Sequence, residues 1–257
     1  MNIIVPIKVL ADDQDIVVAA DRSLDDSKAH RIVSTYDLNA IEAAVQLASA
    51  HEGSKVVCVS VADAKADDSK LKKGILARGV DELVMIADDA CADLDAHATA
   101  AMLARLVDGL DAADLIVCGD GSADNYAQQV DVQLAAELGM PVVNAVTSIK
   151  LEDGVAVVER TLPDVVEEIE VPLPAVVAVT PECAYPRIAG MREILTAGKK
   201  PATVTSAADA GVDVSAAVEI ASVTAPEQAA RKRQVFDMKN DGDFDAFASA
   251  VAAAVRA

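Results

Sequence analysis

Small and polar residues gather between positions 119 and 130, directly after an apolar run that ends at Cys118. Gly119, Gly121 and Ser122 let backbone N–H groups approach a ligand, and a helix that starts at about residue 124 adds partial positive charge. The segment predicts a phosphate-binding loop. The alternative is an ordinary strand-to-helix turn capped by Asp124. The segment matches neither the GxGxxG fingerprint nor the P-loop.

A second candidate edge is Pro6, Ile7 and Lys8, where the first apolar run ends. Open α/β sheets bind ligands beyond the carboxyl ends of their strands. These three residues are therefore a second candidate edge for ligand binding.

No residue pattern indicates catalysis by this chain, because no nucleophile stands with a paired base. The Cys residues form no CxxC pair and fit neither a disulfide framework nor a zinc site, and the His residues lie far apart. They are Cys58, Cys91, Cys118, Cys183, His30, His51 and His97. We predict buried structural thiols and no metal site.

The amino-acid composition excludes further classes of function. The 257 residues are 53% hydrophobic, contain no Trp and carry a formal net charge of −20. Such acidity argues against nucleic-acid binding, which needs clustered Lys and Arg, and it suits solubility or adaptation to salt. The apolar runs are too short to span a bilayer, so we expect a cytoplasmic protein.

Strand-like and helix-like segments alternate in the first half of the chain. The predicted strands are residues 2–9, 55–61, 83–87 and 114–118, and the predicted helices are 37–50, 70–77, 99–110 and 124–138. Asp37 is the expected N-cap of the first helix. Apolar strands joined by helices predict an α/β fold, a parallel sheet with helices on both faces.

The pattern then changes to hairpin strands at residues 142–150, 155–160, 165–171 and 175–180. After them we expect an irregular arm that ends in a helix with an apolar face at Phe244, Phe247, Val251 and Val255. A long segment without periodicity is unusual inside one domain. We therefore predict an α/β domain over residues 1–183 and an arm over 184–257 that wraps another chain.

Several short motifs occur in an order that resembles one family. They are residues 34–44, 76–82, 117–122 with 127–129, 158–160, 167–169 and 174–178. In this order and spacing they resemble the β (small) subunit of electron-transfer flavoproteins over the whole chain. The Gly-Asp-Gly-Ser loop is closest to the FixA branch.

The resemblance implies an adenine-nucleotide-binding fold and a heterodimer with an α subunit that holds most of a redox-active FAD. Electrons would pass from dehydrogenases to a quinone-linked or other acceptor, without catalysis by this chain alone. The β site would bind AMP, or a second FAD in electron-bifurcating members. The implied site residues are Pro6, Ile7, Lys8, Tyr36, Asp37, Leu38, Val61, Gly119, Asp120, Gly121, Ser122, Asp124, Asn125, Tyr126, Ala127, Gln128, Gln129 and Val130.

The chain departs from the family pattern at three positions. Pro163 replaces an acidic residue in a turn. Asp131 stands where members often have Gly, and its carboxylate would repel a phosphate if it pointed inward. Asp120 stands where many bifurcating members have Lys, which disfavours a second FAD. The rival functions are a bifurcating subunit, a stand-alone adenine-nucleotide-binding regulator, and an enzyme acting on adenylated substrates.

Residues 187–192 resemble the family's partner-recognition loop, with Met191 as the apolar anchor. Met is flexible and fills irregular pockets, while Arg187 and Arg192 could pair with acidic rims on a partner. The alternative is that Met191 packs against the body of its own subunit.

Overall fold

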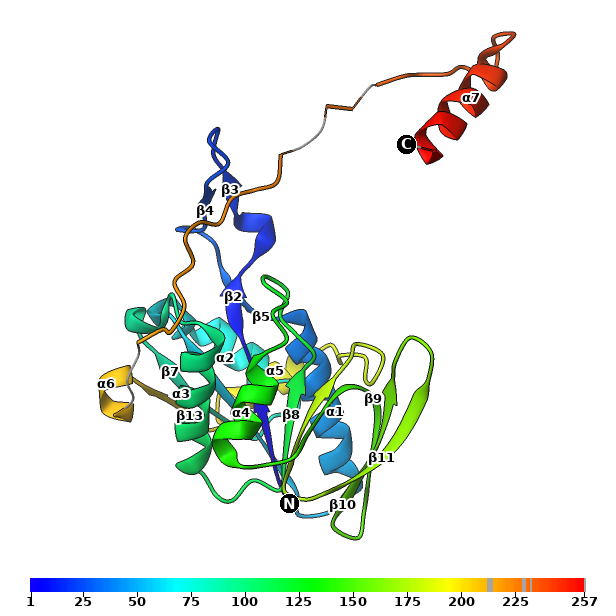
Figure 1. The fold of residues 1–257 in the computed structure, drawn as a ribbon. Coiled ribbons are helices and arrows are strands. Elements are labelled where there is room, and N and C mark those ends of the chain that lie inside the picture. The colour runs from blue at the N-terminus through cyan, green and yellow to red at the C-terminus, as the bar shows by residue number, and fades with distance from the viewer. Residues whose placement is uncertain (212–214, 228–229, 232, 257) are drawn as a thin grey trace. The chain divides into compact units, whose positions relative to one another are not determined.

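Nine strands form one sheet, in the order β11-β10-β9-β12-β8-β1-β6-β7-β13 (Figure 1). The computed structural model describes residues 1–211, 215–227, 230–231 and 233–256. Contacts divide the chain into one unit of Met1–Val17 with Asp25–Val223 and a second of Val18–Leu24 with Thr224–Ala257. The sheet and the candidate site lie in the first unit.

The centre of the sheet is parallel. Its strands are β1 (Asn2–Pro6), β6 (Lys55–Ala62), β7 (Glu82–Ala87), β8 (Leu115–Gly119), β12 (Ala175–Val179) and β13 (Ala202–Thr205). β1 is flanked by β6 on one side and β8 on the other, so the winding of the chain reverses between β1 and β8. Ligands of open α/β sheets bind at such a reversal.

The hairpin strands extend one end of the sheet. β9 (Val142–Glu152), β10 (Val155–Thr161) and β11 (Val166–Pro172) are antiparallel neighbours, and β9 joins the parallel part through β12. Two small two-stranded sheets lie outside the large sheet. They are β2 (Val9–Ala11) with β5 (Arg31–Val33) and β3 (Val17–Val18) with β4 (Leu24–Asp25).

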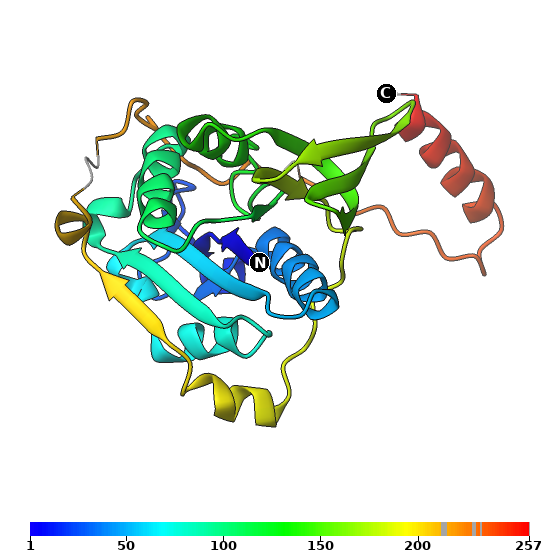
Figure 2. The ribbon, with the colours of Figure 1, turned by 90° about the horizontal axis from the view of Figure 1, so that it is seen from below.

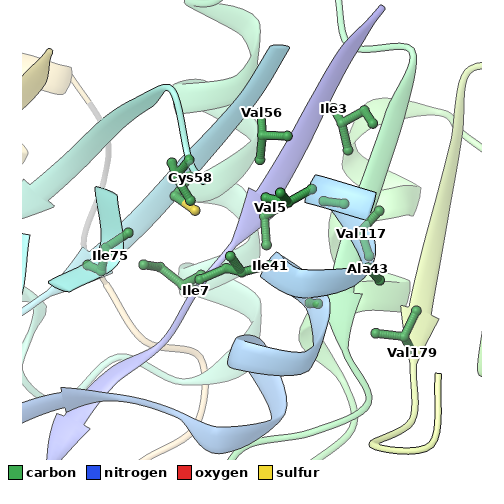
Figure 3. Packing of buried hydrophobic residues seen from close by; sticks show 14 of the residues in the cluster. Ile3, Val5, Ile7, Ile41, Ala43, Val56, Cys58, Ile75, Val117 and Val179 are labelled. Atoms are coloured by element: carbon green, nitrogen blue, oxygen red, sulfur yellow. The ribbon is translucent and has the colours of Figure 1, made fainter. Parts of the chain in front are cut away.

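Helices cover both faces of the sheet, as the sequence predicts (Figure 2). α1 (Thr35–Ala50) and α2 (Ser69–Leu76) pack on one face, and α3 (Ala96–Asp108) and α4 (Val130–Leu138) pack on the other. Alternate residues of each strand serve the two faces. Ile3 and Val5 point to the α1 side (Figure 3) and Ile4 to the α3 side. Because apolar side chains alternate between the two faces with a period of two, each strand packs against the helices on both faces of the sheet.

Three local expectations are wrong. The first strand ends at Pro6, and Val9–Ala11 forms a separate strand. α1 begins at Thr35 with Ser34 at its N-cap position, because the Asp37 carboxylate turns toward the neighbouring loops instead. α4 begins at Val130 rather than near residue 124, because positive φ values at Tyr126 and Gln128 cannot continue a helix.

The segment after residue 184 is more regular than predicted. It contains α5 (Met191–Ala197), α6 (Ala207–Ala210) and β13, which pairs with β7 and forms one edge of the sheet. The expectation of an irregular arm is therefore wrong for residues 191–210. The division into domains 1–183 and 184–257, with an arm around another chain, stays a prediction.

The second unit ends in α7 (Asp243–Val255), which confirms the predicted terminal helix. Ser23 and Thr224 form an antiparallel bridge in this unit, and the rings of Phe236 and Phe247 meet at 5.7 Å. No described residue of α7 is buried, and Phe244 and Val255 are 68% and 81% exposed.

Candidate functional site

A buried carboxylate joins the ends of β1 and β8. Asp37, in the first turn of α1, accepts the Lys8 backbone N–H through Oδ2 at 2.7 Å. Burial raises the pKa of Asp37 to about 7, against backbone hydrogen bonds from Lys8 and Gly119 that lower it. One side chain thus fixes the two loops that the sequence predicted to meet.

Gly119 makes this approach possible. A Cβ atom on Gly119 would lie 2.6 Å from Oδ1 of Asp37 and 2.8 Å from the carbonyl carbon of Tyr36. Both distances are shorter than any van der Waals contact. The last residue of β8 must therefore be Gly if Asp37 is to reach it.

The side chain of Lys8 also contacts the loop after β8. Lys8 Nζ lies 2.6 Å from Oδ2 of Asp124, and the Ser122 hydroxyl donates to the other Asp124 oxygen at 2.5 Å. The Ala123 N–H donates to the buried Ser34 hydroxyl at 3.3 Å. Sequence reasoning missed Ser34, because it placed the start of the helix at Asp37; here the Ser34 hydroxyl does not cap α1 and bonds a distant loop instead.

Tyr126 covers the outer part of the loop. Its hydroxyl donates to Oδ2 of Asp120 at 2.8 Å, and Gln128 Nε2 donates to the same oxygen at 3.0 Å. The Tyr126 ring lies 5.1 Å from that of Tyr36. The hydrogen bond to Asp120 and burial raise the pKa of Tyr126 to about 12, so its hydroxyl stays a donor at neutral pH.

Gly121 lies directly beneath this ring. A Cβ on Gly121 would lie 2.3 Å from Cδ2 of Tyr126. The small residue therefore makes room for Tyr126, and the expected close approach at Gly121 involves a side chain of the same loop.

Backbone donors follow Tyr126. Among the residues that the structure describes, no acceptor receives the N–H groups of Ala127, Gln128 and Gln129. Consecutive free N–H groups beside a residue with positive φ, here Gln128 at +53°, form a concave array that suits an anion.

Asp131 already occupies the start of α4. Its carboxylate is buried and accepts the backbone N–H of Val132, and burial raises its pKa. The nearby Asp120 charge acts in the same direction. The N–H of Val132 in the first turn of α4 is thus engaged, and we take the loop before the helix as the better anion site.

The other predicted site residues contribute less directly. Pro6 and Ile7 are buried below Lys8, and Leu38 is partly buried against the core on the α1 side. Val61 lies near the end of β6 and packs with the core on the α3 side. Asn125 is exposed at the loop tip, and Val130 begins α4.

The three predicted docking residues occupy different environments. Met191 is 78% exposed at the start of α5, and Arg192 is exposed beside it. Arg187 is held within the chain, because its Nε lies 2.6 Å from the largely buried Glu42 carboxylate. Only Met191 and Arg192 are thus free to meet a partner without breaking an internal ion pair.

The residues that the structure describes give no support for metal binding or for reactive thiols. They contain no cluster of three or more metal-ligating side chains. Cys58 and Cys118 are buried, and burial raises the pKa of both thiols. No described helix combines the length and the apolar character needed to cross a bilayer.

The chain also matches the model of a known protein family. The electron transfer flavoprotein domain matches residues 21–210, which include α1, the 119–130 loop, the hairpin strands and β13.

Proposed function

Because the chain belongs to the electron transfer flavoprotein domain family, we propose that it is the small (β) subunit of a heterodimeric electron-transfer flavoprotein of the FixA branch. In this role it carries electrons together with an α subunit, from dehydrogenases to a quinone-linked or other acceptor. The observation that carries the proposal is the joining of the β1 and β8 loops through Asp37 at the point where the sheet's winding reverses.

The ligand proposed for this edge is AMP. Its phosphate suits the free N–H groups of Ala127, Gln128 and Gln129 and the nearby ammonium group of Lys8. Lys8 is already paired with Asp124, so a bound phosphate would share or replace that carboxylate. These residues therefore fit a phosphate without rearrangement of the sheet.

A second FAD suits the site less well. Asp120 and Asp131 add negative charge to the loop against one cation, Lys8. Asp120 stands where many bifurcating members of the family that this chain resembles have Lys, so a second phosphate would meet a carboxylate in place of a cation. We therefore take AMP as the ligand, and the bifurcating function is the second candidate.

The redox chemistry would be supplied by an FAD held mainly by the α subunit. This chain would help to enclose that cofactor and would bind AMP structurally. Two exposed apolar features support a partner role: the α7 face with Phe244 and Val255, and Met191 at the start of α5. We assign α7 to the α subunit and Met191 to the dehydrogenase.

The nucleotide site is tested with Lys8→Gln, and Lys28→Gln is the control because Lys28 is also exposed. Loss of a charge-assisted contact to phosphate costs about 1–2 kcal/mol, or roughly tenfold in affinity. We expect AMP titrated into nucleotide-stripped heterodimer to bind Lys8→Gln about tenfold more weakly, and Lys28→Gln as wild type. Equal affinity of all three proteins would exclude Lys8 from the site.

A further inference from the structure

Two residues of the candidate loop adopt a backbone conformation that their side chains disfavour. Tyr126 has a φ of +45° and Gln128 has a φ of +53°. Residues other than Gly rarely adopt positive φ, and such conformations persist only where the surrounding contacts impose them. Residues strained in this way concentrate at ligand-binding sites. The contacts that hold these two residues therefore bear on what the loop binds.

Both strained residues are tied to one carboxylate oxygen. The Tyr126 hydroxyl and Gln128 Nε2 donate to Oδ2 of Asp120, at 2.8 Å and 3.0 Å. Asp120 directly follows β8, and its own N–H donates to the Val179 carbonyl oxygen at the end of β12, at 3.0 Å. The carboxylate thus connects the strained part of the loop to the sheet. We call the side chains of Asp120, Tyr126 and Gln128 the Asp120 clasp.

The Tyr126 ring is fixed from two further sides. It lies 5.1 Å from the ring of Tyr36, in the first turn of α1. A Cβ atom on Gly121 would lie 2.3 Å from Cδ2 and 2.5 Å from Cε2 of the Tyr126 ring. The ring is therefore seated on the backbone of its own loop, and any side chain at position 121 would displace it.

The clasp holds the part of the loop that contains the free N–H groups. Residues 122–124 are held by bonds to other elements. Farther along, the described side chains of residues 125–129 bond Asp120 and, in α4, Gln133. The free N–H groups of residues 127–129 lie in this second segment. Their directions follow from the positive φ values that the clasp imposes.

We propose that Asp120 is a positioning residue for the phosphate of the bound nucleotide: through Tyr126 and Gln128 it holds residues 126–129 in the conformation that presents their N–H groups. The proposal rests on the proposed nucleotide function and deepens it, because it gives an acidic residue a favourable role in anion binding. Because the clasp sets the donors in place before the ligand arrives, binding does not have to order the loop.

Charge and clasp predict opposite effects of one substitution. If Asp120 acts through its charge alone, its removal relieves repulsion, and every neutral substitution tightens phosphate binding. If Asp120 acts through the clasp, Asp120→Ala releases Tyr126 and Gln128 and weakens phosphate binding despite the lost repulsion. Asp120→Asn keeps a side-chain oxygen that accepts from both donors, so it should bind phosphate at least as tightly as wild type.

The test titrates AMP, adenosine and orthophosphate separately into the full-length chain after removal of nucleotide. The variants are Asp120→Ala, Asp120→Asn and Tyr126→Phe, of which the last removes the hydroxyl bond without a change of charge. The matched controls are Asp164→Ala and Tyr185→Phe, at exposed positions outside the loop. The melting temperature of each variant is measured, so that misfolding is recognised separately.

We expect Asp120→Ala and Tyr126→Phe to bind AMP roughly tenfold more weakly than wild type. Both controls should bind AMP as wild type does. Adenosine affinity should be unchanged throughout, because adenosine lacks the phosphate. Tighter AMP binding by Asp120→Ala, or unchanged binding by Tyr126→Phe, would overturn the proposal. Equal losses for AMP and adenosine would also overturn it, since they would place the clasp against the base.

Two further outcomes separate the clasp from the AMP assignment and from misfolding. If wild type binds orthophosphate but not AMP, the AMP assignment fails, and the same comparison with orthophosphate tests the clasp; binding of neither would overturn both. If Asp120→Ala melts early, Gly121→Ala replaces it. That variant keeps every charge and displaces the Tyr126 ring, and AMP binding as tight as that of wild type would overturn the proposal.

Discussion

Protonation of Asp37 should control the stability of this fold between pH 5 and pH 8. The carboxyl group is buried, and its pKa is raised from 3.8 to about 7. The folded state thus binds the proton more tightly than the unfolded state does. Stability from this group is full below the unfolded pKa of 3.8 and is lost as the pH rises through about 7.

The magnitude follows from the two pKa values. A difference of about three pKa units corresponds to a ceiling of about 4 kcal/mol. Between pH 5 and pH 8 the linkage relation gives a loss of about 2–3 kcal/mol from Asp37 alone. Asp37→Asn abolishes this titration. In this variant the amide group faces the N–H donors of Lys8 and Gly119. We expect the substitution to shift the free energy of unfolding from that of wild type by about 1–3 kcal/mol, and we expect this contribution not to vary with pH.

The assay is urea unfolding of the purified chain, followed by far-ultraviolet circular dichroism at pH 5 and pH 8 and fixed ionic strength. From pH 5 to pH 8, the free energy of unfolding of wild type should fall by about 2–3 kcal/mol more than that of Asp37→Asn. Asp164→Asn, which removes an exposed carboxylate, should follow wild type. Parallel pH dependences of wild type and Asp37→Asn would refute the reasoning.

Three further substitutions test other contacts. Gly119→Ala should destabilise the chain by about 1–3 kcal/mol in urea unfolding, because its Cβ would lie 2.6 Å from the Asp37 carboxylate; an unchanged midpoint would contradict this packing. Arg187→Ala leaves the Glu42 carboxylate buried without its ion-pair partner, so it should lower the free energy of unfolding by about 1–3 kcal/mol. The double variant with Glu42→Gln should recover part of that loss. Additive losses from the two substitutions would argue against the ion pair. Met191→Ala should slow electron transfer with the natural dehydrogenase by a docking loss of about 1–2 kcal/mol, with flavin, AMP and melting temperature unchanged; normal kinetics, or loss of flavin, would exclude a docking role.

The repeating pattern of the sequence was enough to predict most strands of the sheet. Strands such as Lys55–Ala62 and helices such as Thr35–Ala50 carry an apolar periodicity that sets their type. β13 was not predicted, because four residues with two Thr carry no such signal; pairing with β7 makes this segment a strand. Tertiary contact here decides the local structure.

The candidate site could be predicted in outline only. The clustering of Gly, Ser and Asn after β8 located the loop, but the bonds that hold it depend on contacts between distant segments. Asp37 reaches Lys8 across 29 positions, and Ser34 reaches Ala123 across 89. The positive φ at Tyr126 is stabilised by its bond to Asp120 and its contact with Tyr36; residue type alone does not indicate it.

The central claim is a subunit that binds one AMP and shares one FAD with an α partner. Its most direct test is co-expression of both subunits, purification of the complex, and counting of FAD and AMP after acid release, for the full chain and for a chain ending at residue 239. The account predicts one FAD and one AMP per full-length heterodimer, and loss of partner and FAD without α7. Two FAD with no AMP would contradict the AMP assignment, and full FAD retention without α7 would contradict the role given to that helix.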